Sequence, residues 1–148
     1  MVTKDFPAPS ASARVLGLAG LLPFLAGAVA LAVLDAPGLK AWAATALVAY
    51  AALIATFLGG IHWGLAMRGV QPVTARLVWG VSPSLLAWVA VMLPVSMGLS
   101  LLVLLLVTCY AVDRQFYASA GLSGWLGLRL QLTSVATLSC LVGAWAVR

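Results

Sequence analysis

Charge is what this sequence lacks most. Only 7% of its 148 residues are Asp, Glu, Lys or Arg, whereas 64% are hydrophobic, and the mean hydropathy is +1.14. A typical soluble domain is about a quarter charged, because its surface has to face water. The shortage of charge excludes a water-soluble domain and predicts an integral membrane protein.

Residues that perform chemistry are also few, since the chain has three acidic residues, one histidine and two cysteines. Cys109 and Cys140 fall inside apolar runs, where a cysteine is typical of a packed core rather than of a disulfide or a metal site. The sequence has no nucleophile beside a base, no pair of carboxylates, no phosphate-binding loop and no metal-ligand spacing. We therefore expect no catalytic residue, no metal and no enzymatic activity.

The net charge of +5 comes from eight basic residues that stand singly near the ends of apolar runs. Nucleic-acid-binding proteins group such residues in a block or on one face, so no nucleic-acid partner is expected. In a membrane protein the side richer in Lys and Arg faces the cytoplasm. Six basic residues flank one side of the expected bundle and two flank the other: Lys4, Arg14, Arg68, Arg76, Arg114 and Arg129, against Lys40 and Arg148. This bias predicts a cytoplasmic N-terminus and a C-terminus outside.

Five apolar runs are each long enough to cross a bilayer, whose hydrocarbon core of about 30 Å needs about 20 helical residues. We expect an all-α bundle of five transmembrane helices within one domain over 14–148, at residues 14–34, 39–67, 76–93, 99–117 and 125–147. The first 13 residues contain prolines and small polar side chains, which predicts a disordered tail. A cleaved signal peptide is the less favoured interpretation of the first run, because the run is long and Asp5 disturbs the basic region before it.

The only histidine stands inside the apolar stretch FLGGIHWGLA, residues 57–66. A histidine within a membrane helix normally faces protein, so His62 is a candidate functional residue. It lies about 9 Å from the helix end at Arg68, in the inner leaflet. It could donate an interhelical hydrogen bond, line a ligand pocket or relay a proton, or ligate haem or a metal. The hydrogen bond is the favoured interpretation and haem the least favoured, because a second haem ligand is missing.

Glycines surround this histidine. Gly60 and Gly64 form a small-xxx-small pair, which lets another membrane helix approach closely, and Gly59 stands one turn before His62. Small neighbours can also leave room for a ligand, but helix packing is the favoured interpretation.

Other polar residues fall at the same depth, near the predicted cytoplasmic face. Asp113 either reaches the lipid headgroups or pairs across helices with Arg129 or His62. The indole N–H of Trp63, which lies deep in the expected membrane span, also needs an acceptor. The candidate ligand-binding or polar cluster consists of His62, Trp63, Ser82, Ser84, Asp113 and Arg129.

Three stretches occur in the order FLGGIHWGLA (57–66), SPSLLAW (82–88) and RLQLT (129–133). With them the chain resembles the transmembrane protein 69-like family over essentially the whole region 14–147. That family is a domain of unknown function, found in proteobacteria and, in animals, as a mitochondrial protein. The resemblance implies an energy-coupling membrane as the location, here a bacterial inner membrane, but it implies no reaction.

Two hypotheses of different kinds follow. The favoured one is a small accessory or assembly subunit that packs against a larger respiratory or photosynthetic membrane complex, because the loops are short and catalytic residues are lacking. The alternative is a binder or carrier of a quinone, porphyrin or lipid, in a pocket near the cytoplasmic face with His62, Trp63, Ser82 and Ser84 in its wall. Membrane lipids and a larger membrane complex are the expected partners, and no cofactor is required.

Overall fold

Helices make up nearly all of the chain in the computed structural model, which describes residues 8–148. They are α1 (Ala11–Ala19), α2 (Leu22–Val33), α3 (Pro37–Met67), α4 (Val73–Met92), α5 (Val95–Phe116) and α6 (Leu126–Ala146). Two short 3-10 helices, η1 (Ala118–Ala120) and η2 (Ser123–Trp125), connect α5 to α6.

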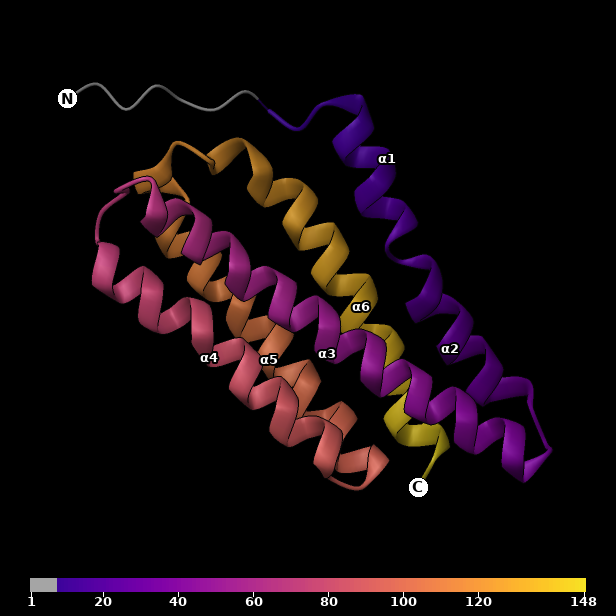
Figure 1. Cartoon of the computed structure of the whole chain (residues 1–148). Coiled ribbons are helices and arrows are strands. Elements are labelled where there is room, and N and C mark those ends of the chain that lie inside the picture. The colour runs from indigo at the N-terminus through magenta and orange to yellow at the C-terminus, as the bar shows by residue number, and fades with distance from the viewer. Residues whose placement is uncertain (1–7) are drawn as a thin grey trace.

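Within residues 8–148, five segments are long and apolar enough to cross a membrane: Ala11–Val33, which contains α1 and α2, then α3, α4, α5 and Ser123–Ala146, which contains η2 and α6. Short connections join successive spans, which therefore run antiparallel (Figure 1). The predicted all-α bundle of five transmembrane helices is confirmed. We call the end of the bundle that holds the α3–α4 and α5–α6 connections the basic end, because Arg68, Arg114 and Arg129 lie there.

The first span differs from the continuous helix expected over 14–34, because it breaks between α1 and α2. Pro23 explains the break: its ring has no N–H and would clash with the carbonyl group four residues earlier in a continuous helix. Tyr50 of α3 donates its hydroxyl to the carbonyl oxygen of Gly20 at 2.8 Å. This bond satisfies a backbone group at the break, which would otherwise be unpaired in an apolar environment.

The expected tail does not extend to residue 13, because α1 already begins at Ala11. Ser10 caps this helix, and its hydroxyl accepts a hydrogen bond from the backbone N–H of Ala13 at 3.2 Å. Serine is among the preferred residues at this position. Residues 1–7 of the expected tail lie outside the described residues.

Glycines do bring two helices close together, but only one of the expected ones takes part. α3 and α4 form the most extensive contact in the bundle, and a Cβ added to Gly59 would clash with the carbonyl oxygen of Gly80. By contrast, a Cβ on Gly60 or Gly64 would meet no described atom within 4 Å. The described residues therefore show no close helix contact at Gly60 or Gly64, and the packing role expected of this pair stays a prediction. Each residue turns a helix by about 100°, so Gly60 points away from the face that Gly59 presents to α4.

The N-terminal helix stands apart from the rest of the bundle. α2 packs against α3 and α6, whereas α1 contains no buried residue and touches chiefly α6. Figure 1 shows α1 at the outer edge, beside α6 and above the break that leads into α2. Because α1 is held loosely, the space between it and α3 is not closed by tight packing.

Candidate functional site

Three ionisable side chains from three helices meet inside the bundle near its basic end. Asp113, in the last turn of α5, accepts a hydrogen bond from Nε2 of His62 (α3) at Oδ1, over 3.0 Å. At Oδ2 it accepts one from Nε of Arg129 (α6) over 2.8 Å, and Nη2 of Arg129 lies 2.6 Å from the same oxygen. The exposed fractions are 0% for His62, 2% for Asp113 and 8% for Arg129. The two pairings that the sequence offered as alternatives for Asp113 occur together.

This cluster ties α3, α5 and α6 together at a depth where a lone charge would be costly. The charges of Asp113 and Arg129 balance, and each carboxylate oxygen has a donor. Removing one member of such a buried pair leaves the other charge uncompensated, which costs about 3–5 kcal/mol. The cluster therefore anchors the basic end of the bundle.

His62 uses one of its two ring nitrogens in this cluster. Nε2 donates to the carboxylate, whereas Nδ1 has no hydrogen-bond partner among the described residues. The rings of Phe116 and Tyr117 enclose the imidazole, with centroids 5.7 Å and 6.2 Å away. This enclosure favours the interpretation of His62 as an interhelical hydrogen-bond donor.

Arg76 is a buried cation whose role the sequence did not indicate. It is 0% exposed, and its Nη2 donates to the backbone carbonyl of Phe116 and to Oγ of Ser119, both at 2.9 Å. Its guanidinium also lies 5.0 Å from the centroid of the Phe116 ring. Arg76 thus caps the C-terminal end of α5, where the helix dipole favours a positive charge. In the sequence it looks like a single orienting charge, because nothing nearby marks it as buried.

Tyr117 follows the last residue of α5 and is 3% exposed. Burial raises the pKa of its phenol to about 12; the Asp113 carboxylate adds to this rise, and the Arg129 guanidinium opposes it by its charge and by a hydrogen bond. The phenol therefore remains protonated at physiological pH and can donate a hydrogen bond.

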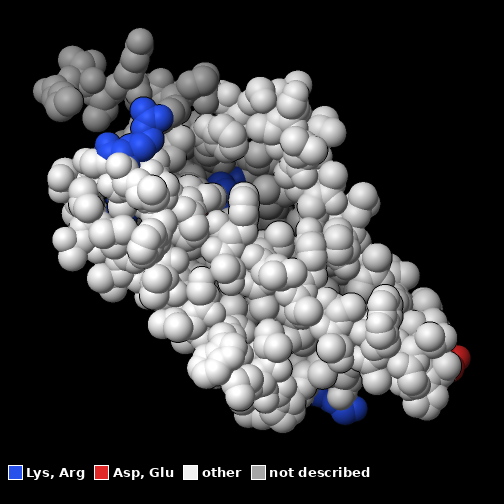
Figure 2. All heavy atoms as spheres, viewed as in Figure 1, with Lys and Arg blue, Asp and Glu red and all other residues white. Residues whose placement is uncertain are grey.

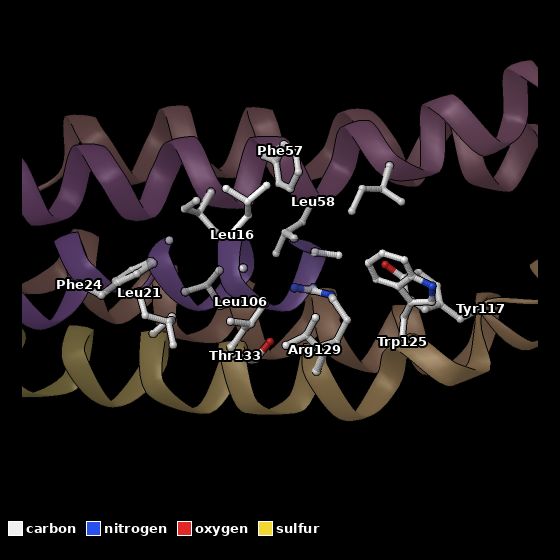
Figure 3. A pocket seen from close by; sticks show the side chains of 18 residues that line it. Leu16, Leu21, Phe24, Phe57, Leu58, Leu106, Tyr117, Trp125, Arg129 and Thr133 are labelled. Carbon is white, nitrogen blue, oxygen red and sulfur yellow. The ribbon is translucent and has the colours of Figure 1, made fainter. Parts of the chain in front are cut away.

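Next to the charged cluster, a cavity of about 380 Å³ lies between α1, α3 and α6. Most of its wall is apolar, with Leu16, Phe57 and Leu58 around its middle and Phe24 at one end (Figure 3). Arg129 reaches into it from α6 (Figure 3). The same face is hollowed in the space-filling view, with a basic side chain visible in the hollow (Figure 2). Sites for small molecules are typically about 300–1,000 Å³, mostly apolar, with a few placed polar groups.

Thr133 is the second polar residue of α6 in this wall, and it lies one helical turn beyond Arg129. It is 7% exposed, and its hydroxyl has no hydrogen-bond partner in the described part of the chain. Other helical hydroxyls of this protein, those of Thr108, Ser134 and Thr137 among them, donate to the carbonyl four residues earlier at 2.8–2.9 Å. Thr133 thus lines the cavity, and its buried hydroxyl has no hydrogen-bond partner among the described residues.

The predicted cluster residues divide into two groups. His62, Asp113 and Arg129 come together, and Arg129 also lines the cavity. Sequence reasoning missed the side of the bundle on which the cavity lies, because the break before α2 and the loose packing of α1 create it.

The second group lies on another face. Trp63 is 42% exposed, and its indole N–H donates to the carbonyl of Leu77 on α4 at 3.0 Å. Ser82 donates to the carbonyl of Val78 within its own helix at 2.9 Å. None of Trp63, Ser82 and Ser84 lines the cavity, and neither does His62. The pocket wall expected from these four residues is thus not formed at the cavity.

Comparison with known proteins gives one family. Over residues 9–145 the chain matches the family described as protein of unknown function (DUF3429). It is 39% identical over 92 residues to transmembrane protein 69 of Xenopus tropicalis (60% of this chain, 34% of the relative), and 30% identical over 142 residues to transmembrane protein 69 of Mus musculus (93% and 56%). The chain thus spans between a third and just over half of the length of these relatives. No solved structure matches it.

Proposed function

The chain belongs to the DUF3429 family of proteins of unknown function, and because that membership implies no reaction, we propose a function from the cavity itself: binding of an amphiphilic small molecule within the membrane. The resemblance to the transmembrane protein 69-like family that the sequence indicated is confirmed. The observation that carries the proposal is the cavity of about 380 Å³, which is mostly apolar and is lined by a buried arginine and by a threonine whose hydroxyl has no described hydrogen-bond partner.

The placement of the cavity suits a ligand that arrives from the lipid. Leu16 is 73% exposed and Phe57 is 67% exposed, and both also line the cavity. Their side chains therefore stand at its edge, between the interior and the surroundings of the bundle. An amphiphile would enter between α1 and α3 with its apolar part toward these residues and its polar part toward Arg129.

For location, we propose the cytoplasmic leaflet of a bacterial inner membrane, with the basic end of the bundle on the cytoplasmic side. Support comes from the basic residues, since Arg68, Arg114 and Arg129 lie at this end and Lys40 and Arg148 belong to the opposite one. The cavity reaches from Arg129 toward the middle of the bundle, at Phe24. Its polar groups would then lie at the depth of the inner leaflet.

The role of an accessory or assembly subunit of a larger membrane complex stays a prediction. It does not conflict with the cavity, because a ligand-binding protein can also be part of a complex. The cavity is the more specific feature, and binding therefore comes first.

The test uses the full chain purified from its membrane in a mild detergent. Native mass spectrometry measures the fraction of protein that carries a bound small molecule. In the Gly17→Phe variant, a ring would fill the space between α1 and α6, because a Cβ at Gly17 already contacts Leu132 at 3.4 Å. We expect the wild type to retain an amphiphile and this variant to lose at least nine-tenths of it.

The matched control is Gly127→Phe on α6, where an added Cβ meets no described atom within 4 Å. This variant should retain the wild-type occupancy. Equal occupancy in the wild type and in Gly17→Phe, with both proteins folded by circular dichroism, would contradict binding in the cavity.

A further inference from the structure

The polar end of the cavity offers donors but no net charge. Arg129 is the charged residue among the described residues of the wall, and its charge is balanced by Asp113, 2.6 Å from Nη2. A carboxylate or phosphate that entered the cavity would compete with Asp113 for the same cation and would lose its hydration in apolar surroundings. A neutral head group that accepts hydrogen bonds does not meet either cost.

Residues with hydrogen-bond donors for an oxygen acceptor line this end of the cavity. The Thr133 hydroxyl lies one turn from Arg129 on the same face of α6, is nine-tenths buried and has no described partner. A buried hydroxyl without a partner costs about 1–3 kcal/mol, so a ligand oxygen that accepts its hydrogen would recover that free energy. Tyr117, whose phenol stays protonated, lines the same end.

Aromatic side chains form both ends of the cavity. Tyr117 and Trp125 lie together at the polar end beyond Arg129, and Phe24 lies at the far end (Figure 3). Phe57 stands on the opposite wall, on α3 (Figure 3). Aromatic side chains in the wall suit a flat ring as ligand. A pair of aromatic rings contributes about 0.5–1.5 kcal/mol of stabilisation beyond the contribution from the surface area that the rings bury.

We propose that the ligand is a quinone, a neutral flat ring with carbonyl oxygens and a hydrocarbon tail. This inference rests on the proposed function and names the chemical class of its ligand. One ring carbonyl accepts from Thr133, close to the guanidinium of Arg129, and the tail leaves past Leu16 and Phe57 into the lipid. A porphyrin fits less well, because it brings carboxylates and its metal needs a ligand, whereas His62 does not line the cavity.

The experiment compares three probes with alkyl tails of similar length on the full chain in lipid nanodiscs. They are a decyl benzoquinone, decylbenzene without ring oxygens, and the anion decanoate. Each is titrated against a photoreactive alkyl probe bound to the protein, and displacement gives its apparent Kd. We expect the benzoquinone to bind at least tenfold more tightly than either of the other two.

The variant Thr133→Val tests the hydrogen bond with a side chain of nearly equal shape. Since one neutral hydrogen bond accounts for roughly a three- to tenfold change in affinity, the quinone should weaken by that factor while decylbenzene does not change. The melting temperature of the unliganded protein should stay equal or rise, because the variant removes an unpaired buried hydroxyl. A purely structural threonine would show neither the selective loss nor the preference among probes.

The outcomes separate this inference from the proposed function. If all three compounds displace the photoreactive probe equally well, or if decanoate displaces it best, the ligand is not a quinone. The cavity then remains a site for another amphiphile. A quinone affinity unchanged in Thr133→Val overturns the assigned contact and with it the quinone. If Gly17→Phe binds every probe as the wild type does, both proposals fall.

Discussion

At the scale of single residues, Asp113 has the most consequential position in this protein. Among the buried polar side chains of the described residues, Asp113 is the acidic one. It accepts hydrogen bonds from both His62 and Arg129. An acid so placed compensates a cation that would otherwise be isolated in an apolar interior. The stability of the basic end therefore depends on one carboxylate.

Asp113→Asn tests this dependence, because it keeps the shape of the side chain and removes its charge. We expect a loss of about 3–5 kcal/mol in the free energy of unfolding, since Arg129 remains buried and unpaired. Thermal unfolding in detergent, followed by circular dichroism, measures the change. The matched control is Asp35→Asn at an exposed acid between α2 and α3, which should differ from the wild type by less than about 0.5 kcal/mol. Equal stability of the two variants would refute the anchoring role.

At the scale of helices, the contact between α3 and α4 is decided by which glycine faces the neighbour. Gly59 stands against the backbone of Gly80, while Gly60 stands in open space. The two are adjacent in the chain, so they form a matched pair for one experiment.

Gly59→Ala should push α3 and α4 apart and destabilise the bundle by about 1–3 kcal/mol, the usual cost of inserting a methyl group into a closely packed place. Gly60→Ala should leave stability unchanged or raise it by up to about 1 kcal/mol, because alanine is the better helix former. Chemical unfolding of both variants in the same detergent gives the comparison. The opposite order of the two effects would show that the chain packs through Gly60.

Much of the helical layout was predictable from the sequence, because a span of about 20 apolar residues has few alternatives in a bilayer. Gly20 and Pro23 mark the break before α2 in the sequence. The apolar run continues across both residues, however, and therefore led to the expectation of one unbroken helix. What could not be predicted is the rotation of each helix about its axis. Apolar residues face both lipid and core in a membrane bundle, so they do not reveal which side of α3 holds the cavity or that Arg76 is buried.

At the scale of the whole molecule, the basic residues give a testable orientation. With a cytoplasmic basic end, Ser123→Cys in the α5–α6 connection should react with a membrane-impermeant thiol reagent only after the cells are opened. Asp35→Cys, at the opposite end, should react in cells whose outer membrane alone is permeabilised. Both native cysteines are buried, so the wild type provides a low background. The reverse labelling pattern would invert the proposed topology.

The arrangement of the whole bundle would let one small chain combine anchoring with the proposed binding. The charged cluster fixes α3, α5 and α6, and α1 rests beside them without a buried residue of its own. Arg129 and Thr133 on α6 thus form one wall of the cavity, while α1, which has no buried residue, forms another.

The most direct measurement of the central claim maps where a bound quinone lies. The full chain in nanodiscs is irradiated with a quinone whose tail carries a photoreactive diazirine, digested, and analysed by mass spectrometry. We expect labels on α1 near Leu16 and on α3 near Phe57, and their loss in Gly17→Phe but not in Gly127→Phe. Labels spread equally over the exposed face of α4 around Leu85 and Trp88, unchanged by Gly17→Phe, would contradict the account.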